Sequence, residues 1–417
     1  MKLIIHRGTH QIGGSCVEVM AGKTRIVVDA GLPLPSLEDE AVFRESDCPN
    51  VEGLFASENP SVDALLLSHY HGDHAGLLPK VHEKIPVYMG EATARIMEMT
   101  ARFVGKERPA KAAGHFISGK EMYIGDFKVT PYLVDHSAYD AYAFVIEAGD
   151  KRIVYSGDLR LHGRKAKATW YFLKNVPHKV DALLLEGTML GRRNESVLTE
   201  TEVERQAAEF MENEKKPILL MQSAANIDRL VGMYKAARSS EREFVMDIFT
   251  ANMAAAAGGK IPNPFSHPGI RVFYPKRLTD RMFQGGQGEW MSRFSRFKIM
   301  REELCEKSNY CLTVRGSMLN DLRKIGNLQG AGFIYSLWKG YLQTKRMQDF
   351  MRFAEEQHMK TVYLHTSGHA DLRALKQIAA ACTPRYLLPM HTTCPEEYAQ
   401  EFQQVKLLQD GEVFELK

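Results

Sequence analysis

Short apolar runs of strand length, separated by polar turns, fill the first 190 residues of the chain. Residues 25–28, 62–67, 127–134 and 152–155 are rich in Val, Ile, Leu and Tyr, which favours β-strands there. The clearest helical pattern in this part covers residues 90–104. The first part of the chain is therefore expected to be dominated by short strands.

After Glu186 the pattern changes to helices that alternate with apolar strands. Thr201–Glu204 is interpreted as a capping box that opens a helix running to about Glu214. This alternation predicts a small parallel α/β domain from about residue 187 to residue 359. Its expected elements continue with a strand at 217–221, a helix at 227–237 and a strand at 243–249.

The last part of the chain is expected to return to the first domain. With 417 residues, of which 44% are hydrophobic, the chain can bury a large core in two domains, one of them discontinuous. We predict that residues 1–186 and 360–417 form one domain and residues 187–359 the other. The elements expected after residue 360 are a strand at 361–365, a helix at 371–381, a strand at 385–390 and a helix at 395–403.

Four candidate metal ligands lie within six residues, directly after a strand-length apolar run. Side chains two residues apart on an extended segment point the same way, so His69 and His71 can hold one ion. The turn that Gly72 permits directs Asp73 and His74 toward a second ion. A histidine-rich surface segment without metal is the alternative, but the pattern H-x-H-x-D-H after a buried strand disfavours it.

Three further candidate ligands stand where later strands are expected to end. His136 follows residues 127–134, Asp158 follows residues 152–155, and His391 follows the strand expected at 385–390. A single histidine at a strand end is more often a hydrogen-bonded structural residue than a ligand. Four such strand ends in one chain favour a shared site, because α/β sheets place their reactive groups there.

The order of these ligands along the chain resembles that of the metallo-β-lactamase superfamily over most of the sequence. The resemblance implies an α/β fold, a four-layer αββα sandwich, with two zinc ions. It assigns His69, His71 and His136 to the first ion, Asp73, His74 and His391 to the second, and Asp158 as the bridge between them.

An aspartate early in the chain fits the same resemblance. Asp29 ends the strand expected at 25–28 and matches the superfamily's early aspartate, which orients a ligand histidine from behind. A plain turn at the end of a strand is the alternative.

More than two hundred residues separate Asp158 from His391. Hydrolases of small substrates in this superfamily do not usually have so long an insertion at this place. Segments 183–188 and 365–370 resemble motifs A and B of the β-CASP nucleases, which include bacterial ribonuclease J and the endonuclease subunit of the eukaryotic mRNA 3′-end processing complex. Segment 222–229 also resembles the insert of ribonuclease J-like proteins. The resemblance makes residues 187–359 an inserted parallel α/β β-CASP cap domain, with Glu186 as motif A, His369 as motif B and His391 as motif C.

One departure from the family pattern follows His391, where this chain has Thr392-Thr393 and ribonuclease J typically has Gly-Glu. The departure touches no metal ligand. It therefore leaves the expected metal chemistry unchanged and bears only on which particular activity the protein has.

The resemblance implies a zinc-dependent nuclease of single-stranded RNA, with RNA processing or decay as its role. Two zinc ions would lower the pKa of a shared water, and the bridging hydroxide would attack the phosphodiester. The leaving 3′-oxygen needs a proton, and His369 is the candidate acid because a carboxylate such as Glu186 keeps an imidazole protonated. The candidate catalytic residues are Asp73, Glu186 and His369, and His365 and Ser367 are candidates for contact with a substrate phosphate. For His365, a structural histidine at a strand end is the alternative.

Charge adds a second candidate for nucleic-acid binding. The net charge is only +3, but residues 271–301 carry eight Lys and Arg, two acidic residues and six aromatic residues. Such a stretch can neutralise phosphates and stack on unpaired bases. The alternative is an amphipathic helix around residues 290–304 whose aromatic side chains are core.

Composition indicates the cellular compartment of the protein but leaves several functions open. No apolar run of eighteen residues occurs, and the six cysteines are scattered, so we expect a cytoplasmic protein without membrane contact or disulfide framework. The alternatives are a hydrolase of a lactone or thioester on the same fold, a DNA nuclease, and a non-catalytic RNA-binding paralogue. The paralogue is disfavoured because no ligand is lost. The direction of cutting and the oligomeric state, with a homodimer as one alternative, stay open.

Overall fold

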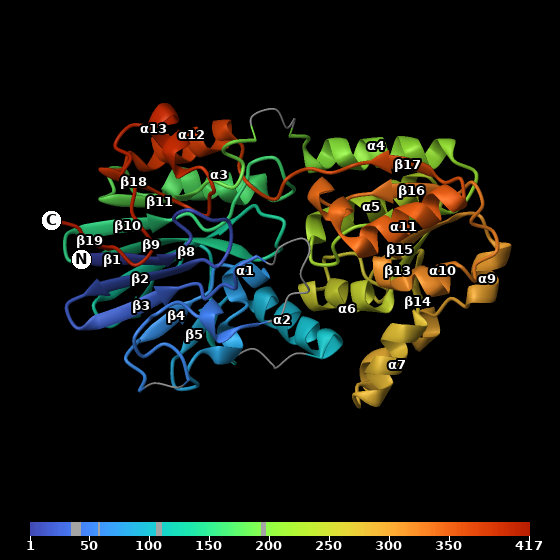
Figure 1. Ribbon diagram of the computed structural model, residues 1–417, viewed down its shortest axis with the longest axis horizontal. Helices are drawn as coiled ribbons and strands as arrows, with labels where there is room; N and C mark the ends of the chain where they lie inside the picture. The colour runs from blue at the N-terminus through green and yellow to red at the C-terminus, as the bar shows by residue number, and fades with distance from the viewer. Residues whose placement is uncertain (35–42, 57–58, 106–110, 193–196) are drawn as a thin grey trace.

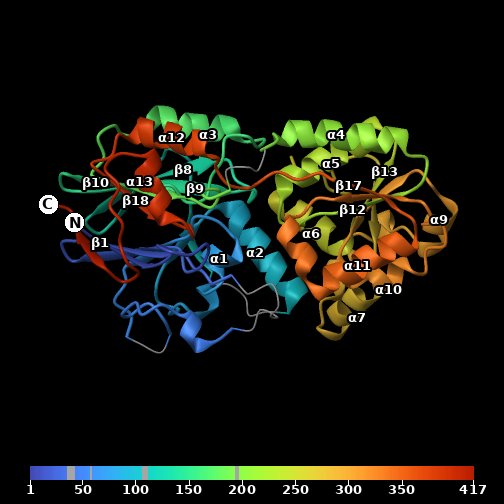
Figure 2. The ribbon, with the colours of Figure 1, turned by 45° about the horizontal axis from the view of Figure 1, so that its top comes forward.

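Three β-sheets organise the molecule, two in one half and one in the other (Figures 1 and 2). The structure, a computed structural model, describes residues 1–34, 43–56, 59–105, 111–192 and 197–417. The first sheet has seven strands, in the order β19 (Val413–Glu415), β1 (Lys2–Arg7), β2 (Cys16–Ala21), β3 (Thr24–Val28), β4 (Ala64–Leu66), β5 (Val87–Met89) and β6 (Ala112–His115).

The second sheet faces the first and has six strands. Apolar side chains from both sheets, among them Ile5 and Leu66 from the first and Phe144 and Leu184 from the second, form one buried cluster between them. Burial of this apolar surface is what holds the two sheets together. The order is β18 (Tyr386–Met390), β11 (Ala182–Glu186), β10 (Lys151–Tyr155), β9 (Ala141–Ala148), β8 (Phe127–Val134) and β7 (Met122–Ile124).

Helices cover the outer faces of both sheets. Leu65 and Val27 point away from the interior of the sandwich and pack in a cluster that Met97 of α2 (Glu91–Val104) joins. On the other side, α3 (Ala166–Asn175) and α12 (Leu372–Cys382) pack against the second sheet. The result is the expected four-layer αββα sandwich, and the burial of both faces explains why its strands read as continuous apolar runs.

The third sheet has six strands and every pairing in it is parallel, so the carboxyl ends of all six lie at one edge. The helices α4 (Glu200–Asn213), α5 (Ile227–Ser239), α6 (Ile248–Ala257) and α11 (Lys345–Glu356) surround it (Figure 1). The strand order is β14 (Ile270–Phe273), β13 (Glu243–Asp247), β15 (Tyr310–Val314), β12 (Ile218–Met221), β16 (Gly332–Tyr335) and β17 (Lys360–Tyr363).

The last strand of this sheet corrects one expectation. β17 pairs with β16 over its whole length, whereas the sequence placed residues 360–417 in the first domain. The chain leaves the third sheet only after Tyr363, because β17 completes the edge of that sheet before the chain turns back.

Two element boundaries also differ from those expected. The capping box of α4 is formed by Thr199 and Glu202, because the Thr199 hydroxyl accepts from the Glu202 amide. The strand expected at 243–249 ends at Asp247, whose carboxylate accepts from the amides of Phe249 and Thr250 and so starts α6.

The basic and aromatic stretch of residues 271–301 does not form the single amphipathic helix around residues 290–304 that was the alternative interpretation. It contains three short helices, α7 (Lys276–Gln284), α8 (Gly288–Ser292) and η3 (Ser295–Phe297), before α9 (Arg301–Glu306). Phe294 is fully buried, whereas Phe283 is 73% exposed on α7, which projects from the body of the molecule in Figure 1.

Among the described residues, no helix has the length and apolar character needed to cross a membrane.

Candidate metal centre

Four strand ends of the sandwich and one short helix deliver the seven expected ligands to one place. His69 and His71 follow β4, and α1 (Gly72–Ala75) carries Asp73 and His74. The remaining three follow the carboxyl ends of β8, β10 and β18, and they are His136, Asp158 and His391. The structure therefore brings together all the side chains that the sequence assigned to the ligand set.

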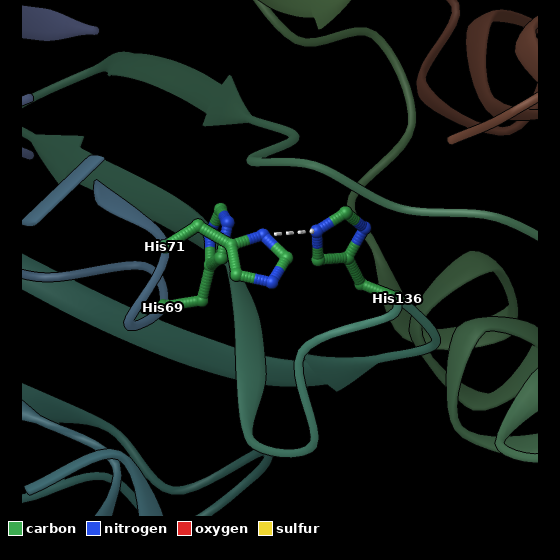
Figure 3. Close-up of side chains that lie close together, drawn as sticks. All are labelled: His69, His71 and His136. Atoms are coloured by element: carbon green, nitrogen blue, oxygen red, sulfur yellow. Dashed lines mark hydrogen bonds between the residues drawn. The ribbon is translucent and has the colours of Figure 1, made fainter. Parts of the chain in front are cut away.

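The first cluster consists of three histidines. Figure 3 shows His71 and His136 facing each other through ring nitrogens, with His71 Nδ1 and His136 Nε2 separated by 3.1 Å. Two nitrogen ligands on one tetrahedral metal at ordinary bond lengths are about 3.3 Å apart. The donor nitrogens of His69, His71 and His136 all lie within 4.8 Å of one another, so these three residues could hold one ion.

The second cluster lies beside the first and Asp158 stands between them. His391 Nε2 is 3.3 Å from Asp73 Oδ2, and His74 Nε2 is 3.2 Å from Asp158 Oδ2. The same Asp158 oxygen is 3.8 Å from His69 Nε2. One carboxylate thus faces ligands of both clusters.

Several donor atoms in this centre are buried without a hydrogen-bond partner in the described part of the chain. They are His69 Nε2, His74 Nε2 and both carboxylate oxygens of Asp158. Buried polar atoms are almost always paired, because an unpaired one loses its hydration without compensation. Imidazole and carboxylate donors are ligands of zinc and similar divalent metals, so the residues present fit a metal centre.

Burial also puts the histidines in the form that binds a metal. Burial, and after it the neighbouring imidazoles, holds the pKa of His69 and that of His136 well below the ordinary value. Both rings are therefore neutral near pH 7, and a neutral imidazole has the lone pair that a metal needs.

Hydrogen bonds on the far side of three rings fix the direction of the ligand nitrogens. His74 Nδ1 lies 2.7 Å from Asp29 Oδ2, as expected for an orienting aspartate. His391 Nδ1 lies 2.8 Å from the hydroxyl of Thr188, and His136 Nδ1 lies 2.6 Å from the Gly368 carbonyl. Such contacts hold each ring in place and set which nitrogen faces the metal.

The backbone at this centre takes unusual conformations. His391 has a φ of 52° and Asp29 a φ of 63°, in the left-handed region that costs an ordinary residue about 1–3 kcal/mol. Gly157, just before Asp158, has a φ of 55°, and a Cβ there would lie 2.8 Å from the Tyr142 carbonyl oxygen. The surrounding hydrogen bonds, such as that from the His391 amide to the Gly8 carbonyl, hold this geometry.

His369 lies at the edge of the centre, against ligands and a further carboxylate. Its Nδ1 is 3.6 Å from both Asp158 Oδ2 and Glu186 Oε2, which is longer than a hydrogen bond. Burial alone would lower the pKa of His369, but the charges of Asp158 and Glu186 outweigh it and raise this pKa above the ordinary value.

Glu186 holds the segment that carries His369 through backbone contacts. Its two oxygens accept from the amides of Ala370 and Thr188, at 3.0 and 2.9 Å. Glu186 therefore acts on His369 through its charge and through the backbone that it holds, and not through a hydrogen bond to the ring.

Two fully buried arginines anchor the loop that leads to His369. Arg160 donates to the Ser367 carbonyl at 2.8 Å, and Arg229 donates to the Leu364 carbonyl at 3.3 Å. Glu200 accepts from both arginines, at 3.1 Å from Arg160 and 2.8 Å from Arg229. Because Arg160 belongs to the sandwich and Arg229 to α5, this network joins the two halves beneath the loop.

His365 and Ser367, the expected substrate contacts, lie on the same loop. The Ser367 hydroxyl accepts from the His369 amide at 3.1 Å. Burial, and then the charge of Arg229, lowers the pKa of His365 to about 4, so this ring is uncharged at neutral pH.

Some residues of the centre had no role assigned from sequence. Thr188 stands in the motif A segment, but nothing in the sequence indicated that its hydroxyl would reach His391, 203 residues later. Arg160 follows β10 and Arg229 lies on α5, and nothing in the sequence indicated that either arginine would be buried. Tyr341 comes from the far half, and its partial burial, followed by the charge of Asp73, raises its pKa.

Comparisons with known proteins agree with this fold and centre. The model of the beta-lactamase superfamily domain matches residues 24–221. Ribonuclease J of Mycoplasma genitalium is 22% identical over 416 residues, which cover 94% of this chain and 67% of that protein. Ribonuclease J2 of Bacillus subtilis is 21% identical over 441 residues, covering 100% of this chain and 75% of that protein. A crystal structure of an Enterococcus faecalis protein of unknown function has the same fold, with a TM-score of 0.79, 22% identity and 99% of each chain covered.

The sandwich and its ligand set define a metal-binding protein of the metallo-β-lactamase kind. The match to the beta-lactamase superfamily model and the relatives named ribonuclease J agree with the resemblance to the β-CASP, ribonuclease J-like family that the motifs indicated.

Proposed function

We propose that this protein is a metal-dependent ribonuclease that hydrolyses phosphodiester bonds of single-stranded RNA. The observation that supports it most strongly is the position of His369, a partly exposed imidazole beside Asp158 and Glu186 at the edge of a seven-ligand centre. Relatives named ribonuclease J along nearly the whole chain support RNA as the substrate.

The ligand set would hold two zinc ions. His69, His71 and His136 would hold one, Asp73, His74 and His391 the other, and Asp158 would bridge them. Bound divalent metals supply a nucleophilic water near neutral pH and neutralise charge on a scissile phosphate.

The residues of the chain would do the rest. Asp73 and Asp158 fix the centre from two sides, and Thr188, Asp29 and the Gly368 carbonyl keep the ligand rings aligned. His369 would hold a proton at Nδ1 and pass it to the leaving 3′-oxygen, which departs poorly as an alkoxide. Glu186 would keep that imidazole charged and in place, and His365 and Ser367 would contact a neighbouring phosphate.

We also propose a setting for the activity. Residues 1–186 together with the segment after Tyr363 would form the catalytic domain, and the third sheet with its helices would form the cap. The substrate would lie between them. The protein would act in the cytoplasm, and two copies would associate as a homodimer.

The test uses purified protein with 5′- and 3′-labelled single strands of RNA and DNA, with and without a chelator. We expect metal-dependent products from RNA, and the ladder from each labelled end reports the polarity of cutting. Turnover of DNA alone would replace RNA by DNA in the proposal. Turnover of a lactone or thioester without any phosphodiester cleavage would overturn it in favour of a small-molecule hydrolase.

A further inference from the structure

Exposed aromatic rings gather beside the metal centre, on the half of the molecule that carries the third sheet. Trp338 and Tyr341 belong to the segment between β16 and α11, where η5 (Lys339–Gln343) lies, and Tyr363 ends β17. Trp338 is 37% exposed, Tyr341 46% and Tyr363 38%. The rings of Trp338 and Tyr341 meet edge to face, with centroids 5.7 Å apart.

Two cations lie over these rings. The Arg192 guanidinium is 5.3 Å from the centre of the Trp338 ring, and the Lys339 ammonium is 4.5 Å from the centre of the Tyr363 ring. Arg192 belongs to the segment that leaves the sandwich after β11, so the cluster is built from both halves. Positive charge over an exposed ring suits a ligand that is both planar and anionic.

Contacts place this cluster next to the centre. Tyr363 packs against His365, with ring centroids 6.0 Å apart, and His365 begins the loop that carries His369. Gly191, the neighbour of Arg192, lies against Cys394, three residues after His391.

We propose that Trp338, Tyr341 and Tyr363 form a stacking platform for unpaired nucleobases of the RNA strand next to the scissile bond. Arg192 and Lys339 would contact the phosphates between those bases. The proposal rests on the ribonuclease function above and specifies how the strand is held there. Every base has a face that can stack on an aromatic ring, so such a platform grips a single strand without regard to sequence, whereas the bases of a duplex are already stacked on each other.

The platform differs from the basic and aromatic stretch of residues 271–301. In that stretch Phe294 is core, and Arg293 lies over Phe294 and Trp290 of the same stretch. The rings of the platform are instead partly exposed and adjoin the centre.

The first test needs no variant. The full-length, metal-loaded protein is titrated with a phosphorothioate-linked RNA of about ten nucleotides, which resists cleavage, and with the same strand carrying abasic sites, and binding is followed by fluorescence anisotropy. Removal of the bases should weaken binding about 10-fold or more, because each stack contributes that much affinity. Equal affinity for both strands would overturn the platform.

Variants then locate the effect. Trp338→Leu should weaken binding of the intact strand about 10-fold and that of the abasic strand hardly at all, whereas Trp338→Phe, which keeps a ring, should retain most of the affinity. Trp170→Leu is the matched control, because Trp170 is 49% exposed on α3, away from the cluster, and its loss should change neither affinity. An equal effect of Trp338→Leu on both strands would exclude stacking at Trp338.

Salt dependence separates the cations from the rings. Arg192→Gln and Lys339→Gln should each reduce the slope of log affinity against log salt by about 1, and Trp338→Leu should leave the slope unchanged. An unchanged slope in both cation variants would remove the phosphate contacts from the proposal. Base-dependent binding without any cleavage of ordinary RNA would reject the ribonuclease function and retain the platform. Cleavage of RNA by a protein whose binding does not depend on the bases would retain the ribonuclease function and reject the platform.

Discussion

In the proposed function, His369 is the residue that distinguishes a nuclease from other uses of the same metal ligands, because it is not among the seven proposed ligands. Its Nδ1 faces Asp158 and Glu186, and it has no hydrogen-bond partner in the described part of the chain. We predict that His369→Ala keeps both metals and binds RNA nearly as well as the wild type, yet cleaves it about 10²–10⁴-fold more slowly. Single-turnover cleavage and elemental analysis measure the two effects.

The leaving group provides the control for this prediction. A nitrophenyl phosphodiester has a leaving group that hardly needs a proton, so the variant should lose far less of its rate on that compound than on RNA. Equal losses on both substrates would assign His369 another role, and loss of metal would make it a ligand.

Asp158 is the residue that faces both clusters of candidate ligands. Its unpaired oxygens face ligands of both clusters, so Asp158→Ala should lower metal content and abolish turnover.

Metal removal should also destabilise the wild type, because a metal that binds only the folded chain raises the free energy of unfolding. Elemental analysis and thermal unfolding with and without chelator test this, and one metal or none in zinc-supplied wild type would contradict the two-ion proposal.

Thr188 acts on the centre through a single hydrogen bond. Thr188→Val keeps the shape of the side chain but removes the hydroxyl that contacts His391 Nδ1. We expect metal affinity to fall about 10–100-fold, which is typical for loss of a contact behind a ligand histidine. Competition with a chromophoric chelator measures the affinity. Thr100→Val on α2, which also removes a hydroxyl, is the control and should leave metal affinity unchanged.

At the scale of elements, the junction between sandwich and third sheet depends on buried charge. Arg160 follows β10, Arg229 lies on α5 and Glu200 begins α4, and together they carry the loop to His369. Burial alone would raise the pKa of Glu200, but the charges of Arg229 and Arg160 outweigh it and lower this pKa to about 2. A carboxylate with a lowered pKa stabilises the fold above its ordinary pKa, and this contribution is lost as the pH falls toward 2.

Glu200→Gln should therefore lower the free energy of unfolding at neutral pH by about 3 kcal/mol or more, since it leaves two buried arginines without their shared anion. Between about pH 4.5 and pH 2 the variant should lose less stability than the wild type, because it lacks the titrating carboxylate. Urea unfolding of chelator-treated protein across this range measures both. Glu209→Gln, on the same helix but exposed, is the control, and a pH profile like that of the wild type in Glu200→Gln would contradict the prediction.

At the scale of the whole molecule, the half with the third sheet lies beside the sandwich (Figure 2), and the loop that follows β17 of that sheet is bound to Arg160 of the sandwich. A substrate that enters between the two halves must be extended, so we predict that single strands are cut much faster than duplexes of the same sequence. Competition between a labelled single strand and a blunt, fully paired RNA measures the preference. Faster cutting of the duplex would contradict an approach between the halves.

The sequence by itself determined the sandwich and grouped the candidate ligands, because strands and the polar residues that follow them leave local marks in the sequence. Each ligand follows an apolar run, and strand ends in α/β sheets meet at a shared edge, so the order of residues alone assigns His69, His136, Asp158 and His391 to one site. The alternation after Glu186 likewise predicted a parallel sheet, because buried strands and amphipathic helices differ in period.

Only the tertiary structure decided which residues support that set. The contact of Thr188 with His391 and the burial of Arg160 and Arg229 join parts of the chain that no periodicity connects. The place of β17 followed from its pairing with β16, and the left-handed backbone of His391 from the hydrogen bonds around it. Such features depend on long-range packing, which the local pattern of side chains does not record.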